Sequence, residues 1–94
     1  MELKDTIDLM LSDNYNDRLR AEYWQTRIRS RKLREMIDKF WEGELDFEPS
    51  CPIEILEEQL QTMNTYMKWL NIRAQIEGVD LYLKNCGMLD KKES

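Results

Sequence analysis

Seven apolar residues recur at alternating spacings of three and four in the second half of this chain. They are Ile53, Leu56, Leu60, Met63, Met67, Leu70 and Ala74. Residues at these spacings lie on one side of an α-helix and form the contact seam of a coiled coil. The pattern therefore predicts a helix over about residues 52–77 that packs this side against another helix, with Gly78 as its stop.

A second seam with the same spacing predicts a partner helix over about residues 14–42. Its members are Leu19, Tyr23, Thr26, Ser30, Leu33, Ile37 and Phe40. The middle of this seam is polar, because Thr26 and Ser30 stand where larger apolar residues would pack better. We expect Ser12 or Asp13 to cap the start of this helix.

Shorter elements are expected around the two long helices. The apolar spacing within residues 4–11 predicts a short first helix, and the apolar residues after Gly78 predict a short final helix that stops near residue 85. The stretch from 43 to 52 is the connecting loop, in which Leu45 and Phe47 are expected to fold back over the end of the helices.

The chain has 94 residues with only three glycines and two prolines, which favours a single all-α domain over a many-stranded fold. We expect this domain to span residues 1–87, as an antiparallel two-helix hairpin with short terminal helices, and residues 88–94 to form a solvated tail. The second long helix carries another apolar stripe, made of Ile55, Thr62, Tyr66, Trp69 and Ile76. Nothing else in so short a chain covers this stripe, so we expect a homo-oligomeric helical bundle.

The net charge of -5 and the pI of about 4.8 argue against duplex nucleic acid or an anionic membrane as the partner. No apolar run is long enough to span a bilayer, and the N-terminal residues lack the features of a signal peptide. These features predict a cytoplasmic protein.

Enzymatic chemistry is not expected. The chain has no histidine, which removes the commonest general base and the commonest metal ligand, and it has no glycine-rich phosphate loop. Cys51 and Cys86 match no metal-binding spacing, and free thiols are favoured over a disulfide. We therefore expect no catalytic residues, no metal and no cofactor.

Residues 18–39 form a basic island, with eight Lys/Arg against three Asp/Glu. Two interpretations stay open. In the lower half, Lys32, Arg34 and Lys39 would face Glu54, Glu57 and Glu58 across the hairpin, and these pairs would neutralise one another. In the upper half the second helix offers little acid before Glu77, so the arginines there are candidates for binding an anion.

Arginine forks suit phosphate oxygens, and aromatic faces suit a nucleotide base. The candidate ligand-binding residues are Arg20, Tyr23, Trp24, Arg27, Arg31, Trp69 and Arg73. For Trp24 and Trp69, however, a core or subunit contact is the more common role of a large aromatic residue at helical spacing. An open helix face holds a nucleotide too weakly for sequestration, whereas a pocket between subunits desolvates the contacts.

The segment DLMLSDNYNDRLRAEY and the run from Tyr66 to Leu81 carry a family resemblance, which extends over residues 1 to about 83. The sequence resembles a family of short tailed-phage proteins typified by a product of a crAss-like gut phage. This resemblance implies a phage origin and expression in a bacterial cytosol. In size, helical content and its Arg/aromatic face the chain is also similar to phage proteins that sequester nucleotide messengers of bacterial defence.

The resulting hypothesis is a phage anti-defence protein that binds a nucleotide immune messenger without cleaving it. The messenger would be of the cyclic ADP-ribose type or a cyclic oligonucleotide. The rival hypothesis is a helical adaptor that binds a host defence enzyme or a virion component. A DNA-binding regulator is disfavoured by the acidic net charge.

Overall fold

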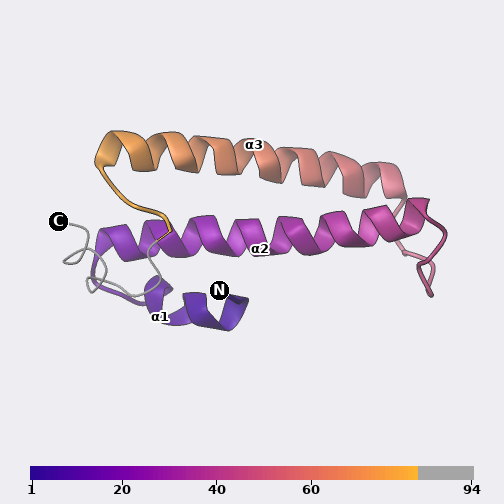
Figure 1. Ribbon diagram of the computed structural model, residues 1–94, viewed down its shortest axis with the longest axis horizontal. Coiled ribbons are helices and arrows are strands. Elements are labelled where there is room, and N and C mark those ends of the chain that lie inside the picture. The colour runs from indigo at the N-terminus through magenta and orange to yellow at the C-terminus, as the bar shows by residue number, and fades with distance from the viewer. Residues whose placement is uncertain (83–94) are drawn as a thin grey trace.

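The computed structural model describes residues 1–82, and within this range all regular secondary structure is helical, without a strand. A 3-10 turn, η1 (Leu3–Asp5), leads into the short helix α1 (Thr6–Met10). The long helices α2 (Tyr15–Trp41) and α3 (Ile53–Glu77) lie side by side, and α1 packs beside the first half of α2 (Figure 1). No helix in this part of the chain has the length and apolar content needed to cross a membrane.

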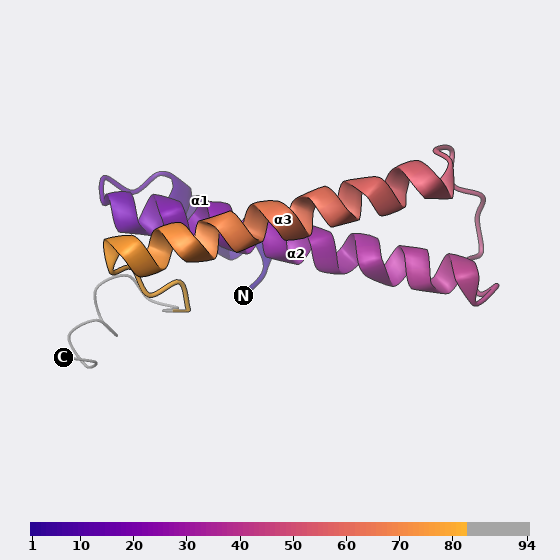
Figure 2. The ribbon, with the colours of Figure 1, turned by 90° about the horizontal axis from the view of Figure 1, so that it is seen from above.

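The two predicted seams meet where α2 and α3 pack together, and the predicted bounds of both helices are confirmed. Every seam residue is buried or half-buried. The largest buried cluster joins Leu19 and Tyr23 of α2 to Leu70 and Ala74 of α3. Seen from above, α3 crosses over α2 at a shallow angle, as packing along a seam of this spacing produces (Figure 2).

The polar middle of the seam is accommodated by local hydrogen bonds. Ser30 is buried, and its hydroxyl donates to the carbonyl of Arg27 at 2.9 Å. The Thr26 hydroxyl likewise donates to the carbonyl of Glu22 at 2.9 Å. Both side chains therefore satisfy their polar atoms within α2 and leave the contact with α3 free of unpaired groups.

The expected cap of α2 is wrong by one or two residues. Asn14 is the N-cap, and its side-chain oxygen accepts a hydrogen bond from the backbone N–H of Asn16 at 2.8 Å. Ser12 has a different partner, because its hydroxyl donates to Asp17 Oδ2 at 2.8 Å. At the other end of the chain α3 stops as expected at Gly78, whose φ of +72° is the left-handed conformation that glycine adopts without strain.

The loop between α2 and α3 does not form the expected lid. Phe47 is 56% exposed, so its ring does not cover the end of the helix pair, although Leu45 is half-buried. Cys51 in the same loop is half-buried and carries a free thiol. Cys86 lies outside the described residues.

Residues 79–82 do not continue as the expected helix. After the left-handed turn at Gly78 the chain runs back across the first turns of α2 (Figure 1). Val79 and Leu81 are 7% and 3% exposed, because they insert into the cluster around Leu19 and Tyr23. The rest of the expected final helix and the tail at 88–94 lie outside the described residues.

Truncation of Leu70 is expected to destabilise the fold strongly. The side chain is 1% exposed and packs at the centre of the main cluster, so Leu70→Ala should lower the free energy of unfolding by about 2–5 kcal/mol. Chemical denaturation followed by circular dichroism measures this loss. Gln75→Ala, an exposed position on the same helix, should change stability by no more than about 0.5 kcal/mol. Equal losses in the two variants would contradict this packing.

Candidate functional site

A cleft lined by arginines opens on one flank of the helix pair, and we call it the basic cleft. Its volume is about 260 Å³. The lining residues are Arg27, Ser30, Arg31 and Arg34 of α2 with Leu60 and Asn64 of α3. The arginines follow one another at spacings of four and three, so they share a face of α2. Leu60 supplies an apolar wall, and the Asn64 amide supplies both a donor and an acceptor.

The middle of the helix pair contains no carboxylate. Residues 23–34 of α2 and 59–76 of α3 include seven Lys/Arg and no Asp or Glu. The acidic residues of both helices lie toward their ends. A partly enclosed cleft strengthens electrostatic attraction relative to open water, so this arrangement favours a bound anion.

The expected neutralisation of the lower basic residues is wrong within residues 1–82. No ion pair there joins Lys32, Arg34 or Lys39 to the acidic first turns of α3. Glu57 instead accepts a hydrogen bond from Trp41 Nε1 at 2.9 Å. The buried residues Ile37 and Ile53 belong to the seam at this end of the pair, and the charged side chains stay exposed on its flanks. Arg34 therefore keeps its charge available in the basic cleft.

Arg27 is held in a fixed position at one end of the basic cleft. Its Nη1 donates to the Tyr23 hydroxyl at 3.1 Å and lies 3.4 Å from the Tyr82 hydroxyl. The guanidinium carbon is 5.1 Å from the centre of the Trp24 ring and 5.7 Å from that of Tyr82, which are cation–π distances. The hydrogen bond to Tyr23 raises the pKa of Arg27 above its ordinary value. This side chain therefore presents a permanent, positioned charge.

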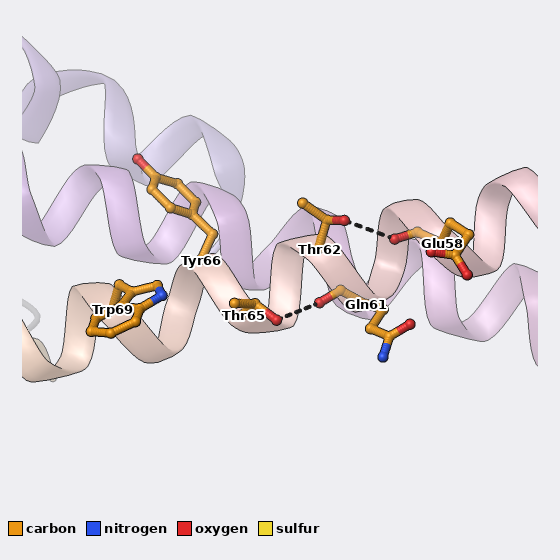
Figure 3. A pocket seen from close by; sticks show the side chains of 6 residues that line it. All are labelled: Glu58, Gln61, Thr62, Thr65, Tyr66 and Trp69. Atoms are coloured by element: carbon orange, nitrogen blue, oxygen red, sulfur yellow. Dashed lines mark hydrogen bonds between the residues drawn. The ribbon is translucent and has the colours of Figure 1, made fainter.

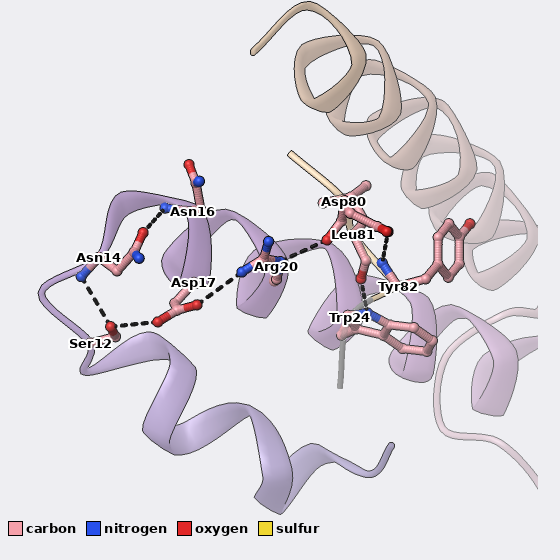
Figure 4. Close-up of polar contacts among 9 residues, drawn as sticks. All are labelled: Ser12, Asn14, Asn16, Asp17, Arg20, Trp24, Asp80, Leu81 and Tyr82. Carbon is pink, nitrogen blue, oxygen red and sulfur yellow. Dashed lines mark hydrogen bonds and ion pairs between the residues drawn. The ribbon is translucent and has the colours of Figure 1, made fainter. Parts of the chain in front are cut away.

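Tyr23 and Trp24 hold the C-terminal segment 79–82 against α2. The rings of Tyr23, Trp24 and Tyr82 contact one another edge to face, with centres 5.8–5.9 Å apart. Trp24 Nε1 donates to the Leu81 carbonyl at 2.6 Å (Figure 4). Tyr23 is only 4% exposed. Both side chains contact Arg27, and Tyr23 is too deeply buried to stack on a base.

The prediction that Arg20 binds an anion is wrong, because its guanidinium is already engaged within the chain. The residue is 2% exposed, and its Nη1 pairs with Asp17 Oδ1 at 3.0 Å. Its Nε donates to the Asp80 carbonyl at 2.7 Å, while Ser12 donates to the other oxygen of Asp17 (Figure 4). A buried cation needs such compensation, and here Asp17, three residues earlier on α2, supplies it. Arg20 therefore ties α2 to segment 79–82.

Trp69 and Arg73 lie away from the basic cleft. Trp69 is five residues from Asn64, which places it about 140° around α3. It is 56% exposed and, with Tyr66, borders a hollow of about 590 Å³ (Figure 3). Arg73 donates from Nη2 to the Tyr15 hydroxyl at 2.5 Å, and its Nε lies 3.8 Å from Glu77.

Of the seven candidate residues, the structure brings only Arg27 and Arg31 into the basic cleft. Sequence reasoning missed Arg34, Ser30, Leu60 and Asn64 as lining residues. The run from 23 to 34, with five Lys/Arg and no acidic residue, was the signal that could have identified Arg34 as part of the cleft.

A comparison with protein families gives one match that covers this region. The family model described as Sequestin matches residues 13–76, a range that contains α2, the loop, all but the last residue of α3 and every residue of the basic cleft. No curated protein and no solved structure matches the chain.

The tyrosine pair beside Arg27 should titrate in two separated steps. Burial alone would raise the pKa of Tyr23, but hydrogen bonds from Tyr82 and Arg27 outweigh it and lower the pKa below 10.0. The hydrogen bond to Tyr23 raises the pKa of Tyr82 above 10.0. One tyrosinate absorbance step should therefore have its midpoint below pH 10.0, and Tyr23→Phe should remove this step while Tyr66→Phe, remote from Arg27, should keep it.

Proton linkage gives the direction in which the stability of the fold changes with pH. The folded chain binds the Tyr23 proton less tightly than the unfolded chain, so the free energy of unfolding should rise as pH increases through the lowered pKa toward 10.0. Above 10.0, the raised pKa of Tyr82 should reverse the slope. A stability that falls steadily across the whole interval would contradict the arrangement at Arg27.

Proposed function

The chain belongs to the Sequestin family, and from that premise we propose that it binds and sequesters a nucleotide second messenger in the basic cleft. The family name denotes sequestration of a molecule. The messenger is of the class used in bacterial immunity, either a cyclic ADP-ribose derivative or a cyclic oligonucleotide. The protein acts as a phage anti-defence factor in the cytoplasm of the host.

The observation that carries this proposal is the carboxylate-free middle of the helix pair, with three arginines directed along one cleft. Planar guanidinium groups match phosphate oxygens and bind them through two parallel hydrogen bonds. Each hydrogen bond to a charged group contributes about 1.5–3 kcal/mol. Three such arginines suit a ligand with two phosphates better than a single inorganic phosphate.

The size of the basic cleft also bears on the ligand. Its volume of about 260 Å³ lies just below the ~300–1,000 Å³ of ordinary ligand pockets. It therefore holds the phosphates and adjoining sugars of a dinucleotide-like ligand. Leu60 and the Asn64 amide complete the contact with these groups, while the bases extend beyond the cleft.

Binding without cleavage follows from the chemistry of the lining. Arginine remains protonated and does not serve as a general base at neutral pH. The Ser30 hydroxyl already donates to the Arg27 carbonyl, and neither a carboxylate nor a histidine lines the cleft. No group in this lining can therefore act as the base that a hydrolysis reaction needs, so the proposed activity is sequestration.

A protein adaptor is the second candidate, and the exposed stripe on α3 favours it. Ile55, Trp69 and Ile76 are 55%, 56% and 79% exposed. Side chains of this kind commonly mark protein contacts. In this reading the stripe binds a host defence enzyme or a virion component.

Removal of cleft arginines should weaken nucleotide binding. Isothermal titration calorimetry against cyclic dinucleotides and cyclic ADP-ribose isomers would identify the ligand. Arg31→Ala and Arg34→Ala should each then raise Kd about 10- to 100-fold, the equivalent of one lost charged hydrogen bond. The measured affinity should also fall as salt increases, because ions screen the phosphate contacts.

Arg29→Ala is the matched control, because Arg29 is an exposed arginine of the same helix that does not line the basic cleft. It should leave Kd within about twofold, since only long-range charge is lost. Equal weakening in all three variants would indicate unspecific attraction. Absence of binding across the ligand panel would remove the nucleotide proposal and leave the adaptor.

A further inference from the structure

The side of α3 turned away from α2 carries an unpartnered stripe, which we call the outer face. It consists of Ile55, Thr62, Tyr66, Trp69 and Ile76. Four of these residues stand seven apart, so they form a nearly straight row along the helix. The large side chains of the outer face are 42–79% exposed, and no other element in residues 1–82 covers them.

The outer face is not flat. Beside Tyr66 and Trp69 lies the hollow lined by Glu58, Gln61, Thr62 and Thr65, with short side chains at its floor (Figure 3). The exposed indole of Trp69 stands at one end of this hollow, and Thr62 lies one heptad earlier on the same row. The face therefore presents a large projecting side chain beside a shallow recess.

We propose that the outer face binds the outer face of a second copy of the chain, with the two α3 helices antiparallel about a two-fold axis near Thr65 and Tyr66. This register places Trp69 of the partner subunit in the hollow beside Thr62. It also places Ile76 of the partner subunit against Ile55. A two-fold contact repeats each of these pairs, so both projections and both recesses are filled.

Charge distribution selects the antiparallel direction. The first turns of α3 contain Glu54, Glu57 and Glu58, whereas the cations of the helix are Lys68 and Arg73. In the antiparallel register Glu58 meets Arg73 of the partner subunit. A parallel pair would instead oppose like charges and align the two helix dipoles unfavourably.

Self-complementarity is the reason to choose a second copy over another protein. Reversal of α3 about its midpoint brings isoleucine onto isoleucine, tryptophan onto a threonine-lined recess and glutamate onto arginine. A face that binds an unrelated protein would not need to be complementary to a second, antiparallel copy of itself at these positions. The basic cleft lies on the other flank of α3, so the pairing leaves it open and does not depend on the ligand.

Molar mass in solution tests the proposal. Sedimentation equilibrium and light scattering on the full chain should give a dimer, and Trp69→Glu should give a monomer with unchanged helix content by circular dichroism. Gln75→Glu is the control, because it adds the same charge at an exposed position of α3 outside the outer face. A monomeric wild-type chain, or a Trp69→Glu variant that remains dimeric, would overturn the proposal.

Crosslinking tests the direction of the helices. In a Cys51→Ser, Cys86→Ser background, Tyr66→Cys should crosslink to itself through a short thiol reagent. Ile76→Cys should crosslink only when mixed with Ile55→Cys. Self-crosslinking of Ile76→Cys would indicate a parallel pair and overturn the register.

Charge exchange provides an independent check of the same register. Arg73→Glu should weaken the dimer at least tenfold by opposing Glu58 of the partner subunit, and the double variant with Glu58→Arg should recover most of the loss. Failure of the double variant to recover would overturn the proposed pairing. Because nucleotide binding at the basic cleft is measured separately, failure here leaves the proposed function standing.

Discussion

The contact between the apolar seams of α2 and α3 is the interaction on which the rest of the structure depends. Because leucine, isoleucine and methionine fill the line between the helices, the many cations of α2 are excluded from that line and emerge on its flanks. Three of them then follow one groove, where α3 offers only Leu60 and Asn64. The same packing that stabilises the fold thus concentrates positive charge without acidic partners among residues 1–82.

The long helices were predictable because their signals are local. Alternating spacings identify which side of each helix is buried, and Gly78 marks an end by its own backbone preference. Segment 79–82 was not predictable in this way. Its path depends on the Asp80 carbonyl meeting Arg20 and the Leu81 carbonyl meeting Trp24, and these partners lie about sixty residues away in the chain. Short apolar stretches adopt whatever conformation such distant contacts impose.

The candidate site was predicted in part for a similar reason. Arg27 and Arg31 were identified because helical spacing brings like side chains together. Arg20 was misjudged because acidic partners were sought on the second helix, whereas Asp17 on its own helix neutralises it from three positions earlier. Arg34 was assigned to a pairing that requires side chains to reach across the seam, and exposed charged side chains gain little from such contacts.

The support of Arg27 by Tyr23, Trp24 and Tyr82 has a consequence for selectivity. This guanidinium is pre-organised, so ordering it costs little entropy when an anion arrives. Arg31 and Arg34 are exposed and retain rotamer freedom that a ligand must remove. The fixed Arg27 together with the adaptable Arg31 and Arg34 can therefore contact anionic groups that lie at different distances from one another. In the proposed function, this combination would let the basic cleft accept a series of related anions instead of a single one.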